Sequence, residues 1–129
     1  MTESLQGAAA SRRRVIVVDD EQTIANTLVV ILNNAGFEAT ASFCGNEAVK
    51  LLESFPPDFL IADVIMPDIS GMEVAIIVRD RFPKCKILLF SGQATTSDML
   101  HVALSRGYEF EIVAKPVHPT FLLEKLRTL

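Results

Sequence analysis

The chain has 129 residues, of which 50% are apolar and 22% are charged, the proportions of one globular domain with a substantial core. Sixteen acidic against twelve basic residues give a net charge of −4, which argues against a strongly electrostatic nucleic-acid binder. The longest unbroken apolar runs, Leu28–Leu32 and Val74–Val78, are far shorter than the roughly 20 residues of a membrane-spanning helix, so integral membrane insertion is excluded.

The first 13 residues are predicted to form a flexible N-terminal tail. Residues 1–11 lack the basic start and apolar stretch of a secretory signal, so we expect a cytoplasmic protein. The basic run Arg12–Arg14 is interpreted as a solvated lead-in to the first strand, and a phosphate or membrane contact is the alternative. Without an export signal, Cys44 and Cys85 are expected to be reduced thiols.

Short apolar runs alternate with longer amphipathic segments along the rest of the chain. Val15–Val18 is apolar throughout, which is typical of a strand buried on both faces of a sheet. Gln22–Asn34 follows with a helical apolar stripe that stops at Gly36. By the same reasoning, the pattern continues in chain order as a strand at Phe37–Ser42, a helix at Glu47–Glu53, a strand at Phe59–Ala62, a helix at Gly71–Arg81, a strand at Ile87–Phe90, a helix at Ser97–Arg106, a strand at Glu109–Ala114 and a helix at Pro119–Leu129.

This strict alternation of strand and helix predicts an α/β domain over residues 14–129. Five strands, each followed by a helix, imply a doubly wound five-stranded parallel sheet with helices on both faces. The sequence ends with the last predicted helix, so we expect a stand-alone domain with no linker to a further one.

Polar residues follow four of the predicted strands, at the edge of a parallel sheet where ligands bind. They are Asp19-Asp20-Glu21 after the first strand, Asp63 after the third, Ser91-Gly92 after the fourth and Lys115-Pro116 after the fifth. No GxGxxG or GxxxxGK[ST] loop is present, so a dinucleotide or nucleoside triphosphate site lacks its phosphate cradle.

The acids at this edge predict a magnesium site and a phosphoryl acceptor. Two carboxylates roughly 5 Å apart repel by about 3 kcal/mol at an effective dielectric near 20, and hard oxygen ligands favour Mg²⁺ as the counter-cation. A carboxylate, a hydroxyl, a lysine and Mg²⁺ together can stabilise a phosphoryl group in transfer. Asp63 ends a fully apolar strand and is the predicted nucleophile for an aspartyl-phosphate.

At these residues the sequence resembles the receiver domain of two-component response regulators, from about Arg14 to Leu129. The matching motifs are Val17-Val18-Asp19-Asp20-Glu21, Asp63-Val64-Ile65-Met66-Pro67-Asp68 with Gly71-Met72, Ser91-Gly92 and Lys115-Pro116. The resemblance implies the (βα)5 flavodoxin-like fold of a receiver. It also implies that Asp63 accepts a phosphoryl group from a sensor histidine kinase or a histidine phosphotransferase.

The resemblance assigns the other site residues as well. Asp20, Asp63 and the Ile65 carbonyl would ligate Mg²⁺, and Asp19 would reach the ion through water. Ser91 would hydrogen-bond the phosphoryl group, Lys115 would pair with it, and Gly92 would leave room for the donor. Such a protein is not an enzyme in the ordinary sense, because it catalyses only its own phosphorylation and dephosphorylation.

Two positions depart from the family pattern. The family's switch usually uses an aromatic residue three positions before the lysine, where this chain has Ile112. Phe110 or Tyr108 would share a face with Ile112 and is one alternative; the hypothesis we favour is a switch without the aromatic residue, which exposes a different surface. Ile65 is apolar where many relatives are polar, so it cannot orient a hydrolytic water, and we predict slow loss of the phosphoryl group.

Three functions are compatible with the sequence. The first is a phosphorylation-dependent switch that acts through an unidentified downstream protein, a phosphorelay or a homodimer, with no nucleic-acid or membrane contact. The second is a phosphatase of the haloacid dehalogenase type. That family requires two aspartates one residue apart, whereas Asp63-Val64-Ile65 has no second acid. The third is a phosphorylation-independent interaction domain of the same fold, for which Ile112 is the main support.

Overall fold

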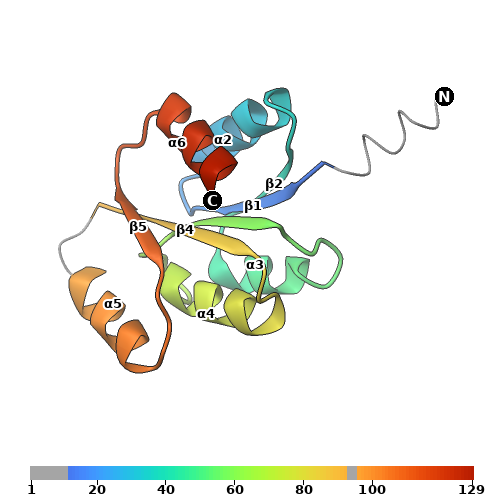
Figure 1. Cartoon of the computed structure of the whole chain (residues 1–129). Helices are drawn as coiled ribbons and strands as arrows, with labels where there is room; N and C mark the ends of the chain where they lie inside the picture. The colour runs from blue at the N-terminus through green and yellow to red at the C-terminus, as the bar shows by residue number, and fades with distance from the viewer. Residues whose placement is uncertain (1–11, 93–95) are drawn as a thin grey trace.

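Five parallel strands form one sheet, in the order β2-β1-β3-β4-β5, in the computed structural model, which describes residues 12–92 and 96–129. Each of these strands is followed by a helix, and every crossover therefore returns the chain to the same end of the sheet (Figure 1). The strands are β1 (Arg14–Val18), β2 (Glu38–Ser42), β3 (Phe59–Asp63), β4 (Lys86–Ser91) and β5 (Glu111–Ala114).

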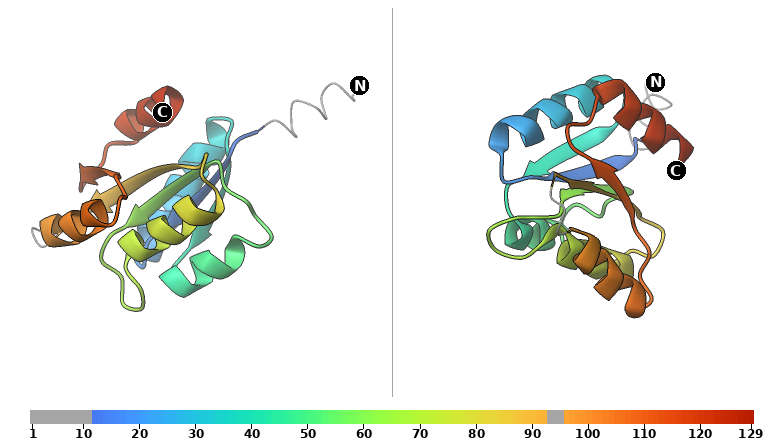
Figure 2. Two further views of the ribbon diagram at one scale, coloured as in Figure 1. Left: turned by 60° about the horizontal axis from the view of Figure 1, so that its bottom comes forward. Right: turned by 90° about the vertical axis from the view of Figure 1, so that its left-hand side faces the viewer.

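The helices cover both faces of the sheet, as predicted. α2 and α6 lie on one face, and α3, α4 and α5 lie on the other (Figures 1 and 2). This is the doubly wound α/β architecture that the strand–helix alternation predicts. The helices are α2 (Gln22–Asn34), α3 (Gly45–Leu51), α4 (Gly71–Arg81), α5 (Thr96–Ser105) and α6 (Pro119–Thr128).

The apolar strands separate two hydrophobic cores. In β1, Ile16 and Val18 pack with α3 and α4, whereas Val15 and Val17 pack on the opposite face with α2 and α6. All four side chains are at most 1% exposed. The continuous apolar run of β1 is thus explained by burial on both faces, because successive side chains of a strand point to opposite sides.

Two predicted elements differ from the structure by two residues, and all other described boundaries differ by at most one. The predicted helix Glu47–Glu53 is α3, shifted two residues earlier, because the Asp68 carboxylate accepts hydrogen bonds from the backbone N–H groups of Gly45 (3.0 Å) and Asn46 (2.7 Å). The predicted strand Glu109–Ala114 begins only at Glu111, because the residues before it pack against α4.

The beginning of the chain is only partly described. Residues 1–11 of the predicted tail lie outside the described residues, while Arg12 and Arg13 are exposed and lead into β1. No helix within residues 12–92 and 96–129 is long and apolar enough to cross a membrane. Cys44 and Cys85 are both free thiols.

Candidate functional site

The structure brings the predicted site residues together at the carboxyl edge of the sheet. Asp19 directly follows β1, Asp63 and Ser91 are the last residues of β3 and β4, and Lys115 directly follows β5. The parallel register pairs Asp63 with Phe90 and Ser91 with Ala114, so neighbouring strands end at nearly the same level. The convergence follows from the sheet itself, since parallel strands present their carboxyl ends at one edge.

The backbone fixes the two inner acids. The N–H of Asp19 donates to the Ser42 carbonyl (3.1 Å), and the N–H of Val64 donates to the Phe90 carbonyl (3.0 Å). Asp19 is 1% exposed and Asp63 is 8% exposed, whereas Asp20 is exposed to solvent. Two buried carboxylates therefore lie beside one that faces outward, and buried charges of this kind require a partner.

Lys115 supplies that partner for both buried acids. Its Nζ lies 2.9 Å from Asp63 Oδ2 and 3.1 Å from Asp19 Oδ2, with Glu21 Oε1 further away at 3.9 Å. Partial burial of the ammonium acts to lower its pKa, but the hydrogen bonds and charges of Asp63 and Asp19 outweigh burial and raise the pKa of Lys115. The lysine thus stays protonated and neutralises part of the cluster.

The segment after Asp63 turns back sharply against the strand. The N–H of Ile65 donates to Asp63 Oδ1 (3.3 Å), and the N–H of Gly71 donates to the Val64 carbonyl (2.8 Å). A Cβ atom at position 71 would lie 2.0 Å from the Asp63 carbonyl oxygen, so only glycine fits where α4 begins. The start of α4 therefore contacts the backbone of the predicted acceptor directly.

The loop between β3 and α4 is held by one further acid to which the sequence assigned no role. Asp68 binds two backbone N–H groups at the start of α3, of Asn46 and Gly45, and these hydrogen bonds hold its pKa at about 2. A carboxylate that caps a helix from 22 or more residues away leaves no local capping pattern, which is why sequence reasoning missed it.

The three aspartates form a donor set that fits a hard divalent cation. Carboxylate oxygens of Asp19, Asp20 and Asp63 lie within 4.8 Å of one another. Oxygen ligands at this spacing suit Mg²⁺, which keeps several waters and binds through a few carboxylates. Three of the four predicted metal ligands thus lie close enough to share one ion; their role as ligands, like that of the Ile65 carbonyl, stays a prediction.

Ser91 and Gly92 complete the rim of the site. Ser91 is 8% exposed, at the end of β4 next to the strand that carries Asp63. A Cβ atom at Gly92 would meet only the Lys115 Cβ, at 3.9 Å, which is an ordinary contact. A side chain at position 92 would therefore meet less backbone crowding than one at position 71.

The alternative of Tyr108 or Phe110 in place of an aromatic residue at position 112 does not agree with the structure. The two rings stack on each other, with centroids 6.1 Å apart, and Tyr108 donates to the Asp80 carboxylate (2.8 Å) in the last turn of α4. Phe110 lies about four residues, or roughly 13 Å along the strand, from the Ala114 level at which Ser91 sits. Both rings are therefore at the opposite end of the sheet from the acids.

An apolar hollow of about 380 Å³ adjoins the acid cluster and was not predicted. It lies between α2 and the segment after β5, and Lys115 borders both the hollow and the acids. Its other lining residues are Ile24, Leu28, Phe90, Pro116 and Val117.

Comparison with known proteins gives one consistent result. The profile of the response regulator receiver domain matches residues 15–127. The transcriptional regulatory protein CreB of Escherichia coli is 34% identical over 106 residues, which cover 82% of this chain and 45% of that protein. The chain thus spans about half the length of the curated relatives it matches.

Solved structures agree in fold. A CheY-like receiver domain protein from Methanospirillum hungatei superposes with a TM-score of 0.82 at 26% identity, covering 92% of this chain and 93% of that one. The response regulator TrrA of Thermotoga maritima, solved with Mg²⁺ and BeF, has a TM-score of 0.75 at 35% identity, covering 90% of this chain and 97% of that one.

Proposed function

Because the chain belongs to the response regulator receiver domain family, we propose that it is a signalling switch that accepts a phosphoryl group on Asp63 from a histidine kinase or a histidine phosphotransferase. The observation that carries this proposal is the environment of Asp63. It ends a central strand, is 8% exposed, and touches the Lys115 ammonium beside two further carboxylates.

The proposed transfer uses groups that lie together at the carboxyl edge of the sheet. One carboxylate oxygen of Asp63 attacks the phosphorus of the donor's phosphohistidine, the phosphorus–nitrogen bond breaks, and the imidazole leaves with its electron pair. Lys115, which already contacts Asp63, would pair with the incoming oxygens, and the hydroxyl of Ser91, at the neighbouring strand end, would donate to them. The chain would act as a catalyst only of its own phosphorylation and dephosphorylation.

Asp19, Asp20 and Asp63 are the residues that would hold Mg²⁺, with the Ile65 carbonyl as a further ligand. Bound Mg²⁺ supplies positive charge that offsets the negative charge of the phosphoryl oxygens. The complex of TrrA with Mg²⁺ and BeF supports the same choice of ion here. Exposed Ile65 offers no hydrogen-bonding side chain to a hydrolytic water, so the phosphoprotein should decay slowly; a half-life of seconds in Mg²⁺ would contradict this.

The apolar hollow beside Lys115 supports a protein donor. A histidine that reaches Asp63 brings its surrounding surface over the neighbouring residues, and Ile24, Leu28 and Val117 offer that surface apolar area to bury. We expect a cytoplasmic protein whose output surface is formed by α5, β5 and α6, where Val102 (58% exposed) and Leu104 (45%) present apolar side chains to a downstream partner.

The test of the proposal is the intact mass of the chain after incubation with acetyl phosphate and Mg²⁺. We expect one phosphoryl adduct on the native chain, none on Asp63→Asn, and an adduct on Asp68→Asn, whose carboxylate lies in the same loop but faces α3. No adduct on the folded native chain would favour the phosphorylation-independent interaction domain instead.

Comparing a protein donor with acetyl phosphate distinguishes binding of the donor protein at the hollow from phosphoryl transfer to Asp63. With autophosphorylated histidine kinases as donors, Ile24→Ser in the hollow should slow transfer, whereas Val30→Ser, a 58% exposed position on the same helix, should not. Acetyl phosphate should modify both variants at the native rate, because it makes no contact with α2. Equal transfer rates from a kinase to the two variants would show that the hollow is not used.

A further inference from the structure

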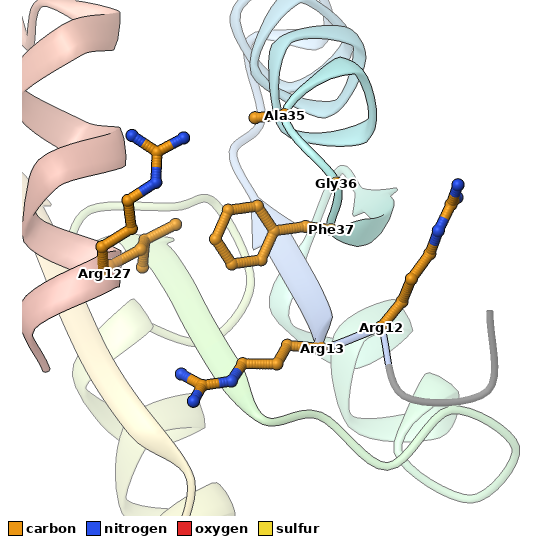
Figure 3. A pocket seen from close by; sticks show the side chains of 7 residues that line it. Arg12, Arg13, Ala35, Gly36, Phe37 and Arg127 are labelled. Atoms are coloured by element: carbon orange, nitrogen blue, oxygen red, sulfur yellow. The ribbon is translucent and has the colours of Figure 1, made fainter. Parts of the chain in front are cut away.

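A second hollow, of about 370 Å³, lies at the amino edge of the sheet and is lined by three arginines. The strands begin at this edge, so the hollow is at the opposite end of the sheet from the acid cluster. Arg12 and Arg13 come from the segment before β1, and Arg127 comes from α6 (Figure 3). Ala35, Gly36, Phe37 and Leu126 complete the lining.

The end of α2 shapes the apolar part of this hollow. Gly36 has a φ of 101°, a conformation that glycine adopts without strain, and the N–H of Phe37 then donates to the Leu32 carbonyl (3.1 Å). This turn directs the Phe37 ring toward α6 (Figure 3), and the ring makes an edge-to-face contact with Phe59 of β3 at a centroid distance of 5.9 Å. Figure 3 shows Arg13 and Arg127 on either side of Phe37, while Arg12 extends away from the ring.

Among the described residues, no acid neutralises the guanidinium groups of this hollow. Arg14, the next residue of the basic run, pairs with Glu38 (3.5 Å), but within the described part of the chain no carboxylate lies within 4.0 Å of Arg12, Arg13 or Arg127. Arg13 instead lies over the Phe59 ring, 5.6 Å from its centroid.

The helix dipoles offset only part of this positive charge. α2 and α6 both end at this edge, and each helix carboxyl end is equivalent to about half a negative charge. Against the two guanidinium charges of Arg13 and Arg127, which flank Phe37 (Figure 3), this leaves about one positive charge in excess. In a chain whose net charge is −4, this excess is not a general property of the surface.

We propose that this hollow binds the phosphate monoester of a small organic molecule. A phosphate monoester carries about 1.5 to 2 negative charges at neutral pH, opposite in sign to the excess, and guanidinium groups bind phosphate oxygens in a bidentate way. The volume of about 370 Å³ falls among ligand pockets of about 300–1,000 Å³ and exceeds the need of a phosphate ion. The Phe37 ring, which is 8% exposed, offers a small apolar wall to the organic part.

Calorimetric titration of the full chain with adenosine monophosphate, inorganic phosphate and phosphatidylcholine vesicles that contain phosphatidic acid tests this proposal. We expect adenosine monophosphate to bind one to one, and more tightly than inorganic phosphate. Arg127→Gln and Arg13→Gln should each weaken binding about tenfold, the loss of one charge-assisted contact. Arg81→Gln, a basic residue of α4 that lines another hollow, should bind like the native chain.

The other possible results show whether the bound phosphate group belongs to a lipid, and whether the hollow binds phosphate at all. Binding of the phosphatidic acid vesicles alone, if lost in Arg127→Gln, supports the same phosphate chemistry with a lipid as its source. No binding of any probe, or equal binding by the native chain and Arg127→Gln, would overturn the proposal. Far-UV circular dichroism and urea denaturation of the variants show that they are folded, so this result does not depend on the fate of the Asp63 proposal.

Discussion

Buried charged side chains are paired at one edge of the sheet, whereas three arginines lack an acidic partner, among the described residues, at the other. At the carboxyl edge, two acids are buried and share one lysine, which lies 2.9 Å from Asp63 and 3.1 Å from Asp19. At the amino edge, Arg12, Arg13 and Arg127 border an open hollow, and the described residues offer them no carboxylate partner. A buried charge costs several kcal/mol without a partner, whereas an exposed one is solvated by water. Ion pairs at the carboxyl edge are therefore part of the fold, and charges at the amino edge remain available to a ligand.

The amino edge also holds the aromatic residues that the family's switch would need near the acids. Tyr108 is bound to Asp80 and stacked on Phe110, and Arg79 lies over the Phe110 ring, 5.9 Å from its centroid. These contacts join the last turn of α4 to the segment before β5. A switch that acts through α5, β5 and α6 must therefore work with Ile112 in place of an aromatic residue.

The largest effect is expected where the backbone of the carboxyl edge is most crowded. Gly71→Ala places a Cβ atom 2.0 Å from the Asp63 carbonyl oxygen, so α4 or β3 must shift, and we expect a loss of about 3 kcal/mol in the free energy of unfolding. Urea denaturation measures this loss. Gly92→Ala is the matched control, because its Cβ atom would lie 3.9 Å from its nearest neighbour and should change stability little. Equal stability of the two variants would contradict this description of the α4 start.

Removal of Lys115 tests whether the charges at the carboxyl edge depend on one another. Lys115→Met leaves Asp19 and Asp63 unpaired; because the lysine is 20% exposed, we expect a loss of about 2–3 kcal/mol, below the range for fully buried pairs. Mg²⁺ should restore more stability to this variant than it adds to the native chain, as urea titrations with Mg²⁺ and with chelator will show.

Lys125→Met is the matched control for this prediction. Lys125 pairs with Glu111 at a more exposed position, where an ion pair contributes about 1 kcal/mol or less. If both lysine variants lost the same stability, the distinction between a buried charge cluster and a surface pair would be wrong.

Asp68 should make stability depend on pH in acid. Its pKa is lowered from 3.8 to about 2 by the N–H groups of Asn46 and Gly45, so its contribution is complete above pH 4 and is lost as the pH falls toward 2. Asp68→Asn should therefore have a lower melting temperature than the native chain at pH 5, and the difference should shrink toward pH 2. Glu53→Gln, at an exposed acid near the end of α3, is the matched control.

The smallest effect is a shift in one titration curve at the amino edge. Tyr108 is the only tyrosine of the chain, and there is no tryptophan, so absorbance of the tyrosinate reports this residue alone. Its hydrogen bond to the Asp80 carboxylate, together with burial, raises its pKa above 10.0, and Asp80→Asn should lower the titration midpoint. An unchanged midpoint would show that the two residues are not in contact in solution.

Local patterns predicted most of the fold and the core of the site. Strand β1 could be read from four consecutive apolar residues, and Asp63 stood out because it follows another such run. The same rule that brings parallel strand ends to one edge placed Asp19, Ser91 and Lys115 together.

Contacts between segments distant in sequence could not be predicted in this way. The start of α3 depends on Asp68, and the start of β5 follows from the contact of Tyr108 with Asp80. The arginine hollow likewise requires Arg127 to lie beside the segment before β1, which a pattern in either segment alone does not reveal. These features depend on how helices pack on the finished sheet.

The most direct measurement is the position of the phosphoryl group. After incubation with acetyl phosphate and Mg²⁺, borohydride reduces an aspartyl-phosphate to homoserine, which peptide mass spectrometry locates in the sequence. We predict homoserine at position 63 alone, with Asp19 and Asp20 unchanged. Homoserine at another aspartate, or at none in the folded native chain, would contradict the assignment of Asp63 as the phosphoryl acceptor.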